Sequence, residues 1–449
     1  MKFGGTSLRD ATAIRSVTKL VRDRRQLSPV VVVSAHAGIT NKLVALADAA
    51  AKTTVDLETM LGEIEAQHRS ILTDLALDAS LLDSLFQDLR DLCRGIRLVG
   101  ECSPRSRDAI LSFGERCSAR AVAAAFDADG IEATAVDAFD LGVRSDSRFG
   151  NALLQVDDGR IASAIAKLRG VPVVTGFIAK DANGNITTIG RNGSDLSAAY
   201  LGNAIDADEI QIWTDVDGVL TADPRVVPTA RPIAEMSYDE AAELANHGGK
   251  VLHPASLAPA IAKSIPVRVL NTHRPDSPGT LIVEQSDDPS LVVRCIAHKR
   301  HVTLVNVESS RMLAQAGFLA KIFGCFQRWN ISVDMIATSE VSVSVTLDNT
   351  VTLDNTDQLE EAVRELNDFA SVTVEQDLGS ICVVGHGIKN RLGVPARVLA
   401  PLQQSGIVVR MVSLGALKVN VSIVVGGNDL DAAVRALHDE FFTEDGQAS

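Results

Sequence analysis

Two segments combine glycines with a basic side chain just before a predicted helix. Residues 2–7 have the sequence KFGGTS and residues 190–195 the sequence GRNGSD. Backbone N–H groups in such turns can approach an anion, and the lysine or arginine adds positive charge. Taken alone, each turn is equally well explained as a helix cap, and the pattern GxxxxGK[ST] is absent. We interpret both segments as candidate binding sites for phosphate or carboxylate groups.

Three other segments carry polar side chains that could do chemistry. Residues 34–41 (SAHAGITN) join a predicted strand to a helix, and residues 213–221 (WTDVDGVLT) end a strand with Asp215 and Asp217. The second segment resembles the nucleophile loop of haloacid-dehalogenase-type phosphatases, in which the first aspartate attacks phosphorus. A turn with solvated aspartates is the alternative. Lys250 lies in a helix-breaking turn at 248–254, where surface charge is the more common explanation.

The elements that must position these segments alternate between strand and helix over residues 1–285. Runs of β-branched residues predict strands at 29–35, 133–136, 171–175, 209–214 and 267–271, and helical periodicity lies between them. This alternation predicts an α/β fold with a mostly parallel sheet sandwiched by helices. Polar loops at the carboxyl ends of such strands form a ligand crevice. Residues 41–97 show only helical patterns and predict a helical insertion.

The remaining chain contains an internal repeat. Gly317, Ile331 and Val343 recur as residues of the same type at an offset of 76, as do Ala320, Met335 and Val345. Each copy predicts a ferredoxin-like βαββαβ unit, with a strand at 331–337 in the first copy. The first unit spans 302–376. The second spans 380–449 and borrows its last strand from 291–297, so that one unit interrupts the other.

The composition limits the classes of partner. The net charge of −14 argues against nucleic-acid binding, which needs basic residues to neutralise phosphates. No apolar run is long enough for a membrane span, and the N-terminus lacks an apolar signal segment. The six cysteines are scattered, without a CxxC pair, which favours reduced thiols and a cytoplasmic protein. The HxxH pattern at 298–301 lacks a third ligand, so we predict no metal site made of protein side chains.

Taken together, the motifs resemble those of the aspartate kinase family. They are KFGGTS (2–7), SAHAGITN (34–41), SFGER (112–116), TGFIAKD (175–181), TIGRNGSDLSAA (188–199), WTDVDGVLTADPR (213–225) and GGKVLHP (248–254). The resemblance covers nearly the whole chain, because two ACT regulatory units follow the kinase domain in this family. The helical insertion and residues 317–344 resemble the monofunctional, lysine-inhibited branch. Family members usually have a short strand before the lysine, so we expect either a shortened first strand or a start further upstream.

The resemblance implies a reaction and a set of roles. The reaction transfers the γ-phosphoryl group of ATP to the β-carboxylate of L-aspartate, with Mg²⁺ held mainly by phosphates and water. It is the first step toward lysine, threonine and methionine. Lys2 would stabilise the transferred group, and Asp195 would orient Lys2. The aspartate pocket would consist of Thr40, Glu115, Phe177, Arg191 and Ser194. The nucleotide would contact Gly4, Gly5, Ser7, Thr214, Asp215, Arg225 and Lys250.

The resemblance also implies regulation by L-lysine and assembly through the ACT units. The matching effector positions are Met312, Phe318, Leu319, Ser332, Val333, Asp334, Ser339 and Glu340. ACT units usually pair across subunits, so a homodimer is expected, with a tetramer as the further assembly. Two other functions stay open at this point: a phosphatase with Asp215 as nucleophile, and a catalytically silent amino-acid sensor.

Overall fold

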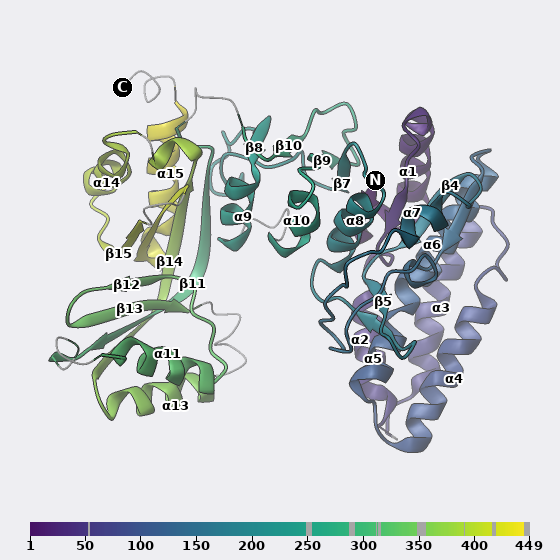
Figure 1. Ribbon diagram of the computed structural model, residues 1–449, viewed down its shortest axis with the longest axis horizontal. Helices are drawn as coiled ribbons and strands as arrows, with labels where there is room; N and C mark the ends of the chain where they lie inside the picture. The colour runs from purple at the N-terminus through teal and green to yellow at the C-terminus, as the bar shows by residue number, and fades with distance from the viewer. Residues whose placement is uncertain are drawn as a thin grey trace. The chain divides into compact units, whose positions relative to one another are not determined.

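The computed structural model describes residues 1–52, 54–247, 254–286, 292–310, 312, 316–347, 356–389, 391–414 and 419–443. The chain forms two compact units (Figure 1). The first consists of Met1–Val219 with Val251–Ser286, and the second of Leu220–Lys250 with Asp287–Ser449. The second unit therefore includes a segment that lies inside the kinase domain expected at 1–285. Those domain boundaries remain a proposal.

The first unit is built on a mostly parallel sheet with the strand order β3-β4-β2-β1-β7-β9-β10. The bounds are Ala133–Val136, Val171–Thr175, Val31–Val33, Lys2–Phe3, Ile210–Thr214, Val267–Asn271 and Thr280–Val283, in that order. Within this order only β10 runs antiparallel to its neighbour. The short strand β1 pairs with both β2 and β7, so the carboxyl ends of these three strands meet at one edge. The predicted fold class is confirmed.

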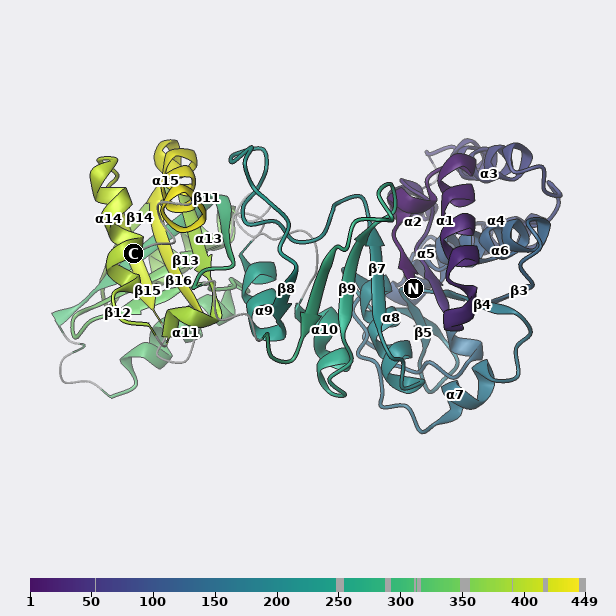
Figure 2. The same ribbon diagram turned by 90° about the horizontal axis from the view of Figure 1, so that it is seen from above.

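Helices flank this sheet (Figure 2). They are α1 (Ala11–Asp23), α2 (Ile39–Ala50), α3 (Leu57–Asp74), α4 (Asp83–Val99), α5 (Pro104–Leu111), α6 (Phe113–Ala128), α7 (Arg160–Ile165), α8 (Gly193–Ala204) and α10 (Pro254–Ile261). The described residues of 41–97 contain no strand, and α3 and α4 run side by side in both views. Their apolar faces share a core with α2, because Leu46, Leu61 and Leu89 are buried together.

Shorter elements hold the loops at the carboxyl edge of the sheet. A 3₁₀ turn, η1 (Gly5–Leu8), follows β1, and a hairpin of β5 (Ile178–Lys180) and β6 (Ile186–Thr188) precedes α8. Asp10 caps α1 by accepting a hydrogen bond from the N–H of Ala13. The chain therefore leaves β1 through the glycine turn and enters α1 within a few residues.

The second unit contains a six-stranded antiparallel sheet in the order β12-β13-β11-β14-β16-β15. The strands are β11 (Cys295–Glu308), β12 (Ile336–Thr338), β13 (Ser342–Leu347), β14 (Ser371–Val384), β15 (Val409–Leu414) and β16 (Asn420–Gly426). Strands β11 and β14 pair along almost their whole length. Residues 295–299 pair with 380–384, which is the pairing that an interrupted second repeat requires. Both repeats thus share one continuous sheet.

Four helices complete the two repeats: α11 (Phe318–Arg328), α13 (Thr356–Asn367), α14 (Val394–Gln404) and α15 (Leu430–Phe442). The unit also contains β8 (Glu235–Ser237) and α9 (Tyr238–Asn246). The sequence predicted a strand at 331–337, whereas β12 begins at Ile336. Helix α11 ends in a left-handed turn at Asn330, with φ of 53°, and the exposed Ser332 and Asp334 follow it before the chain extends.

Candidate active site

A hollow of about 490 Å³ lies at the carboxyl edge of the first unit's sheet. It is bounded by the glycine turn after β1, the loop from β2 into α2, helices α5 and α6, and the loop from β6 into α8. Among the predicted site residues, it brings together Lys2, Gly4, Gly5, Thr40, Glu115, Phe177, Arg191, Ser194 and Asp195. These residues are far apart in the sequence, and the parallel sheet makes them neighbours.

An ion pair joins the two residues to which the resemblance gives catalytic roles. Lys2 Nζ lies 2.6 Å from Asp195 Oδ1, and only 11% and 12% of these side chains are exposed. Asp195 is in the first turn of α8, whose N-cap residue Asn192 makes no side-chain capping hydrogen bond. The carboxylate of Asp195 faces the lysine of the central strand. Breaking such a pair is costly because it leaves one charge buried alone.

The glycine turn packs closely against the loop that follows β2. A Cβ atom on Gly5 would lie 2.9 Å from the carbonyl oxygen of Ala35, so a side chain there would displace the loop. Ser7 does not line the hollow, because its hydroxyl lies 2.7 Å from that of Thr272, after β9, and is buried. Ser7 therefore connects the turn to the segment after β9, while Gly4 and Gly5 line the hollow.

Glu115 supplies a buried carboxyl group at the bottom of the hollow. Its Oε1 accepts a hydrogen bond of 3.1 Å from the N–H of Ala35, and its Oε2 has no hydrogen-bond partner in the described part of the chain. Burial raises the pKa of Glu115 to about 8, and the bond from Ala35 opposes this only in part. Without a cationic partner, this group keeps its proton at pH 7.

The loop before α8 contributes Arg191 and two unusual backbone conformations. Phe177 and Asn192 have φ of 66° and 54°. Asparagine is one of the few residues other than glycine that tolerate this left-handed region. Gly193 packs so closely on Phe177 that a Cβ would lie 2.7 Å from the ring. Arg191 is exposed at the rim, where its guanidinium is accessible to a ligand.

Asp108 is a site residue that the sequence did not single out. This buried side chain accepts hydrogen bonds from the N–H and hydroxyl of Thr188 at 2.8 and 2.9 Å, and from the N–H of Gly150 at 2.9 Å. Burial raises its pKa, and these bonds oppose the shift. Asp108 thus fixes one wall of the hollow. It lies on a helix among other polar residues, so no local pattern distinguishes it.

The residues predicted to bind nucleotide are divided between the units. Thr214 ends β7 in the first unit and Asp215 follows it, and the Thr214 hydroxyl lies 3.2 Å from Asp215 Oδ1. Asp217 accepts hydrogen bonds from Asn271 and Arg274. Arg225 belongs to the second unit, is mostly exposed and pairs with Asp223. Lys250 lies outside the described residues.

The predicted effector residues lie in the first repeat of the second unit. Met312 and Phe318 pack in or against its core. The side chains of Leu319, Ser332, Ser339 and Glu340 are exposed. Val333 and Asp334 line a hollow of about 240 Å³, where Lys299 Nζ lies 3.3 Å from Asp334 Oδ2.

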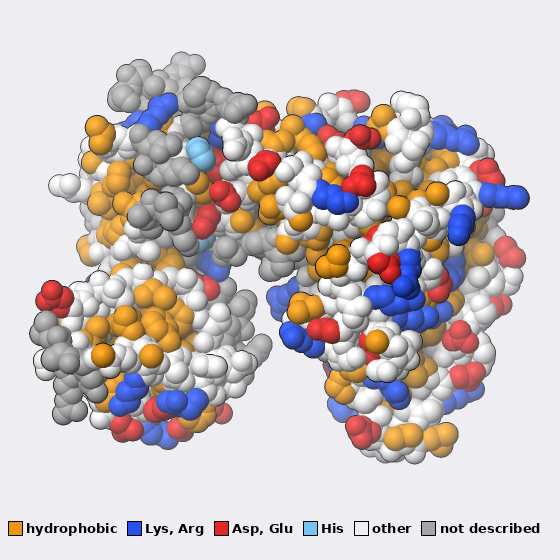
Figure 3. All heavy atoms as spheres, in the orientation of Figure 1, with side chains coloured by type: hydrophobic (Ala, Val, Ile, Leu, Met, Phe, Trp, Pro, Cys, Tyr) orange, Lys and Arg blue, Asp and Glu red, His pale blue; other side chains and the backbone are white. Residues whose placement is uncertain are grey.

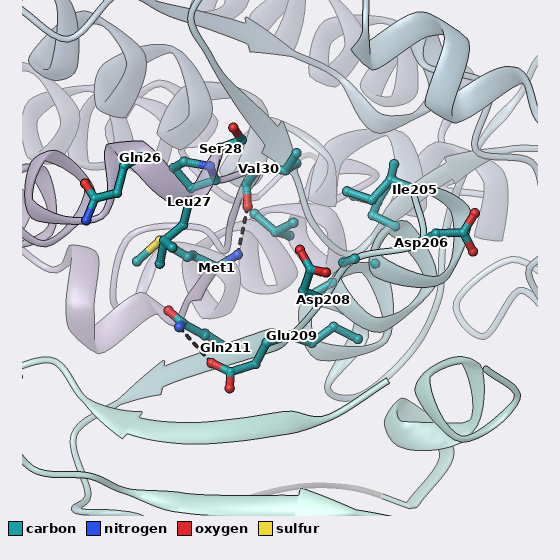
Figure 4. Close-up of a pocket in the computed structure, with 17 residues that line it drawn as sticks. Met1, Gln26, Leu27, Ser28, Val30, Ile205, Asp206, Asp208, Glu209 and Gln211 are labelled. Carbon is teal, nitrogen blue, oxygen red and sulfur yellow. Dashed lines mark hydrogen bonds between the residues drawn. The ribbon is translucent and has the colours of Figure 1, made fainter. Parts of the chain in front are cut away.

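A larger hollow of about 700 Å³ lies near the amino ends of β1, β2 and β7 (Figure 4). The N-terminal amine of Met1 donates a hydrogen bond of 2.8 Å to the carbonyl of Val30, and burial lowers its pKa to about 5. Asp206, Asp208 and Glu209 line this hollow. Their negative charge suits a phosphate poorly, so the hollow that contains Lys2 is the candidate active site.

Comparison with known proteins shows which family contains this arrangement. Residues 1–271 match the amino acid kinase family, and residues 305–368 and 381–441 match ACT domains. The chain is 38% identical to aspartokinase 3, chloroplastic, of Arabidopsis thaliana, across 99% of this chain and 82% of that protein. It is 36% identical to lysine-sensitive aspartokinase 3 of Escherichia coli strain K12, across 98% of each chain. The chain belongs to the aspartokinase family.

Solved structures of an aspartokinase have the same fold. E. coli aspartokinase III in complex with aspartate and ADP superposes with a TM-score of 0.81 at 35% identity, over 98% of this chain and 99% of that one. Its complex with lysine and aspartate superposes with a TM-score of 0.82 at the same identity and coverage. No helix in the described part of this aspartokinase chain is both long and apolar enough to cross a membrane.

Proposed function

We propose that this protein is an aspartate kinase that transfers the γ-phosphoryl group of ATP to the β-carboxylate of L-aspartate, giving 4-phospho-L-aspartate. The observation that carries the proposal is the buried Lys2–Asp195 ion pair beside the glycine turn, in one hollow with Glu115 and Arg191. Membership of the aspartokinase family supports the same reaction, the first step toward lysine, threonine and methionine.

The chemistry requires positioning and charge neutralisation rather than a strong base. The β-carboxylate of aspartate is already ionised near neutral pH, so its oxygen can attack the γ-phosphorus directly while the bond to ADP breaks. Lys2 would neutralise charge on the transferred group, and Asp195 would hold the lysine in place. The bare backbone at Gly4 and Gly5 would approach the phosphate oxygens.

The polar groups in the hollow match the charges of aspartate. The guanidinium of Arg191 would bind the α-carboxylate in a two-point contact. The carboxylate of Glu115 would face the ammonium group once it has lost its proton. Thr40, Phe177 and Ser194 would complete the pocket. The complex of E. coli aspartokinase III with aspartate and ADP supports this class of ligands.

ATP would contact Thr214, Asp215, Arg225 and Lys250, in addition to the glycine turn. We include Mg²⁺ as the partner of the nucleotide. Among the described residues no group of three His, Cys, Asp or Glu side chains could hold a metal ion. By resemblance, the ion would be carried mainly by phosphates and water and would supply positive charge to the transferred group. The carboxylate of Asp195 forms an ion pair with Lys2, so we do not assign it to the ion.

We propose L-lysine as the feedback inhibitor, acting through the eight effector positions named above, where Asp334 and Glu340 carry charges opposite to those of the ligand's amino groups. Lys299 already pairs with Asp334, so an incoming ammonium group would compete with it. The complex of E. coli aspartokinase III with lysine supports this assignment. Binding at these positions would bias the kinase between active and inactive arrangements.

The second unit also supports the proposal of a homodimer. Edge strands β12 and β15 expose Ile336, Val412 and Leu414, and a further copy of the sheet could cover them. Figure 3 shows hydrophobic side chains on this unit, over the region that Figure 1 labels β12, β13 and α11. A tetramer and a cytoplasmic location belong to the same proposal.

The two other functions have less support. The phosphatase would need Asp215 as nucleophile, and Asp215 is not among the residues that line the hollow with the buried ion pair. A silent sensor would not need the complete set of Lys2, Asp195, Glu115 and Arg191. Family membership also favours the kinase over both alternatives.

Trapping of the acyl phosphate tests the proposal. The protein is incubated with ATP, Mg²⁺ and L-aspartate in the presence of hydroxylamine, which converts acyl phosphates to coloured hydroxamates after addition of iron. We expect a signal that needs ATP and L-aspartate, is absent with L-glutamate, and is suppressed by L-lysine. Lysine-insensitive activity would overturn only the regulatory part. No hydroxamate would overturn the kinase assignment.

A further inference from the structure

A histidine outside the hollow is bound to the glycine turn. His36 follows β2, is only 1% exposed and does not line the hollow. Its Nδ1 lies 2.7 Å from the carbonyl oxygen of Leu8, the last residue of the turn. A carbonyl can only accept, so Nδ1 carries the hydrogen and the ring donates this bond. The imidazole therefore links the loop after β2 to the end of the turn that carries Gly5.

Residues of the helical insertion, on α3 and α4, pack against the His36 ring and its loop. The rings of His36 and His68, which is on α3, lie 5.3 Å apart between centroids with an edge-on orientation, and Phe86 of α4 packs on His68 in the same way. The neighbouring Gln67 donates a hydrogen bond of 2.9 Å to the carbonyl of Ala37. Two residues of α3 therefore hold the loop on which His36 lies.

Both rings are neutral in the folded protein. Burial, together with a smaller effect of the nearby His68, lowers the pKa of His36 to about 3. Burial likewise lowers the pKa of His68 to about 4. Within the described chain, Nε2 of each ring is buried without a hydrogen-bond partner. Replacement of His36 by leucine would remove the unsatisfied Nε2 acceptor and keep a similar side-chain volume. Packing alone therefore does not explain a histidine at this position.

We propose that His36 is a positioning residue that fixes the phosphate-facing glycine turn, with α3 as its support through His68 and Gln67. The loop meets the turn at two points, through the contact of Ala35 with Gly5 and through the bond from His36 to Leu8. The turn is short, so a shift at Leu8 reaches Gly4 and Lys2. The inference rests on the proposed kinase function for its kinetic readout.

The expected effect is on turnover rather than on aspartate binding. A misplacement of about 1 Å costs roughly 100-fold in rate when positioning supplies the catalysis. We expect His36→Leu to lower kcat by about 10- to 100-fold, while the KM for aspartate stays near the wild-type value. His36→Asn keeps an N–H donor close to the position of Nδ1 and should restore most of kcat.

A matched control separates positioning from loss of stability. Leu89→Ala removes a buried side chain of α4 in the same helical region without touching the turn, and it should lower the melting temperature because it leaves a cavity. Its kcat should stay near wild type at temperatures where it is folded. Wild-type kcat in His36→Leu, or no recovery in His36→Asn, would overturn the proposal. An equal fall in Leu89→Ala would also overturn it.

A second measurement does not depend on the reaction. Amide hydrogen exchange of the peptide covering residues 1–10 should be faster in His36→Leu than in the wild type, and near wild type in His36→Asn and Leu89→Ala. Unchanged exchange in His36→Leu would overturn the proposal even if the wild type proved inactive. An inactive wild type with the expected exchange pattern would overturn the kinase assignment alone.

Discussion

Glu115 makes aspartate binding dependent on pH, because its carboxyl group must lose a proton before it can face an ammonium group. With a pKa of about 8 in the folded chain, about nine of ten molecules hold this proton at pH 7. The ammonium group of bound aspartate favours the ionised form. Binding at pH 7 should therefore release about 0.9 proton, falling to about 0.1 at pH 9, and the apparent affinity should rise about tenfold between these values.

The same group should affect stability in the absence of ligand. The folded chain keeps the proton up to about pH 8, whereas the unfolded chain loses it near the ordinary value of 4.5. The stabilising contribution is thus fully present below pH 4.5 and is lost as the pH rises to 8. A shift of this size corresponds to about 5 kcal/mol in the free energy of unfolding. Glu115→Gln should abolish this dependence, since an amide does not titrate.

Calorimetry measures the released proton directly. Aspartate is titrated into the protein, with an ATP analogue that cannot transfer its phosphoryl group, in two buffers of different ionisation enthalpy at pH 7, 8 and 9. Glu115→Gln should bind weakly and release no proton. Glu63→Gln, an exposed carboxyl on α3, should behave as wild type. Wild-type binding at pH 7 without proton release would refute the reasoning.

Four other substitutions test the remaining roles. Lys2→Met and Asp195→Asn should each lower kcat by about 10²–10³-fold, and the double variant should be little worse than either because the pair acts as a unit; steady-state kinetics that show additive losses would contradict this. Arg191→Met should raise the KM for aspartate by about 10- to 100-fold, the value of a charged hydrogen bond, and an unchanged KM would move the α-carboxylate elsewhere. Asp334→Asn should raise the lysine concentration that halves activity, and an unaltered inhibition curve would place the effector outside this region.

The sequence predicted those parts of the fold that repeat a local pattern. Runs such as 171–175 and 267–271 are strands because β-branched residues fill a sheet that is buried on both faces. The offset of 76 predicted two equal units because the same apolar positions pack in both. The predicted start of β12 was wrong. Residues 331–335 alternate between buried or half-buried and exposed side chains, as a strand does, but the pairing with β13 begins only at Ile336.

Side-chain direction was harder to predict than residue type. Ser7 was predicted to contact phosphate, and nothing in the sequence indicated that its hydroxyl lies 2.7 Å from that of Thr272, a residue 265 positions away. Asp108 carries no motif because its partners, Gly150 and Thr188, come from other elements. The roles of Lys2 and Asp195 rested on resemblance, and their contact depends on a strand and a helix that meet only in the folded unit. Contacts between residues so far apart in the chain leave no pattern in the local sequence.

Identification of the phosphorylated carboxylate tests the central claim most directly. The protein is incubated with ATP, Mg²⁺ and L-aspartate, and sodium borohydride is added to reduce the acyl phosphate to an alcohol, which chromatography then identifies. Transfer to the β-carboxylate predicts homoserine, which should be absent in Lys2→Met. Formation of 3-amino-4-hydroxybutanoate would show transfer to the α-carboxylate and would contradict the proposed orientation of aspartate between Arg191 and Glu115.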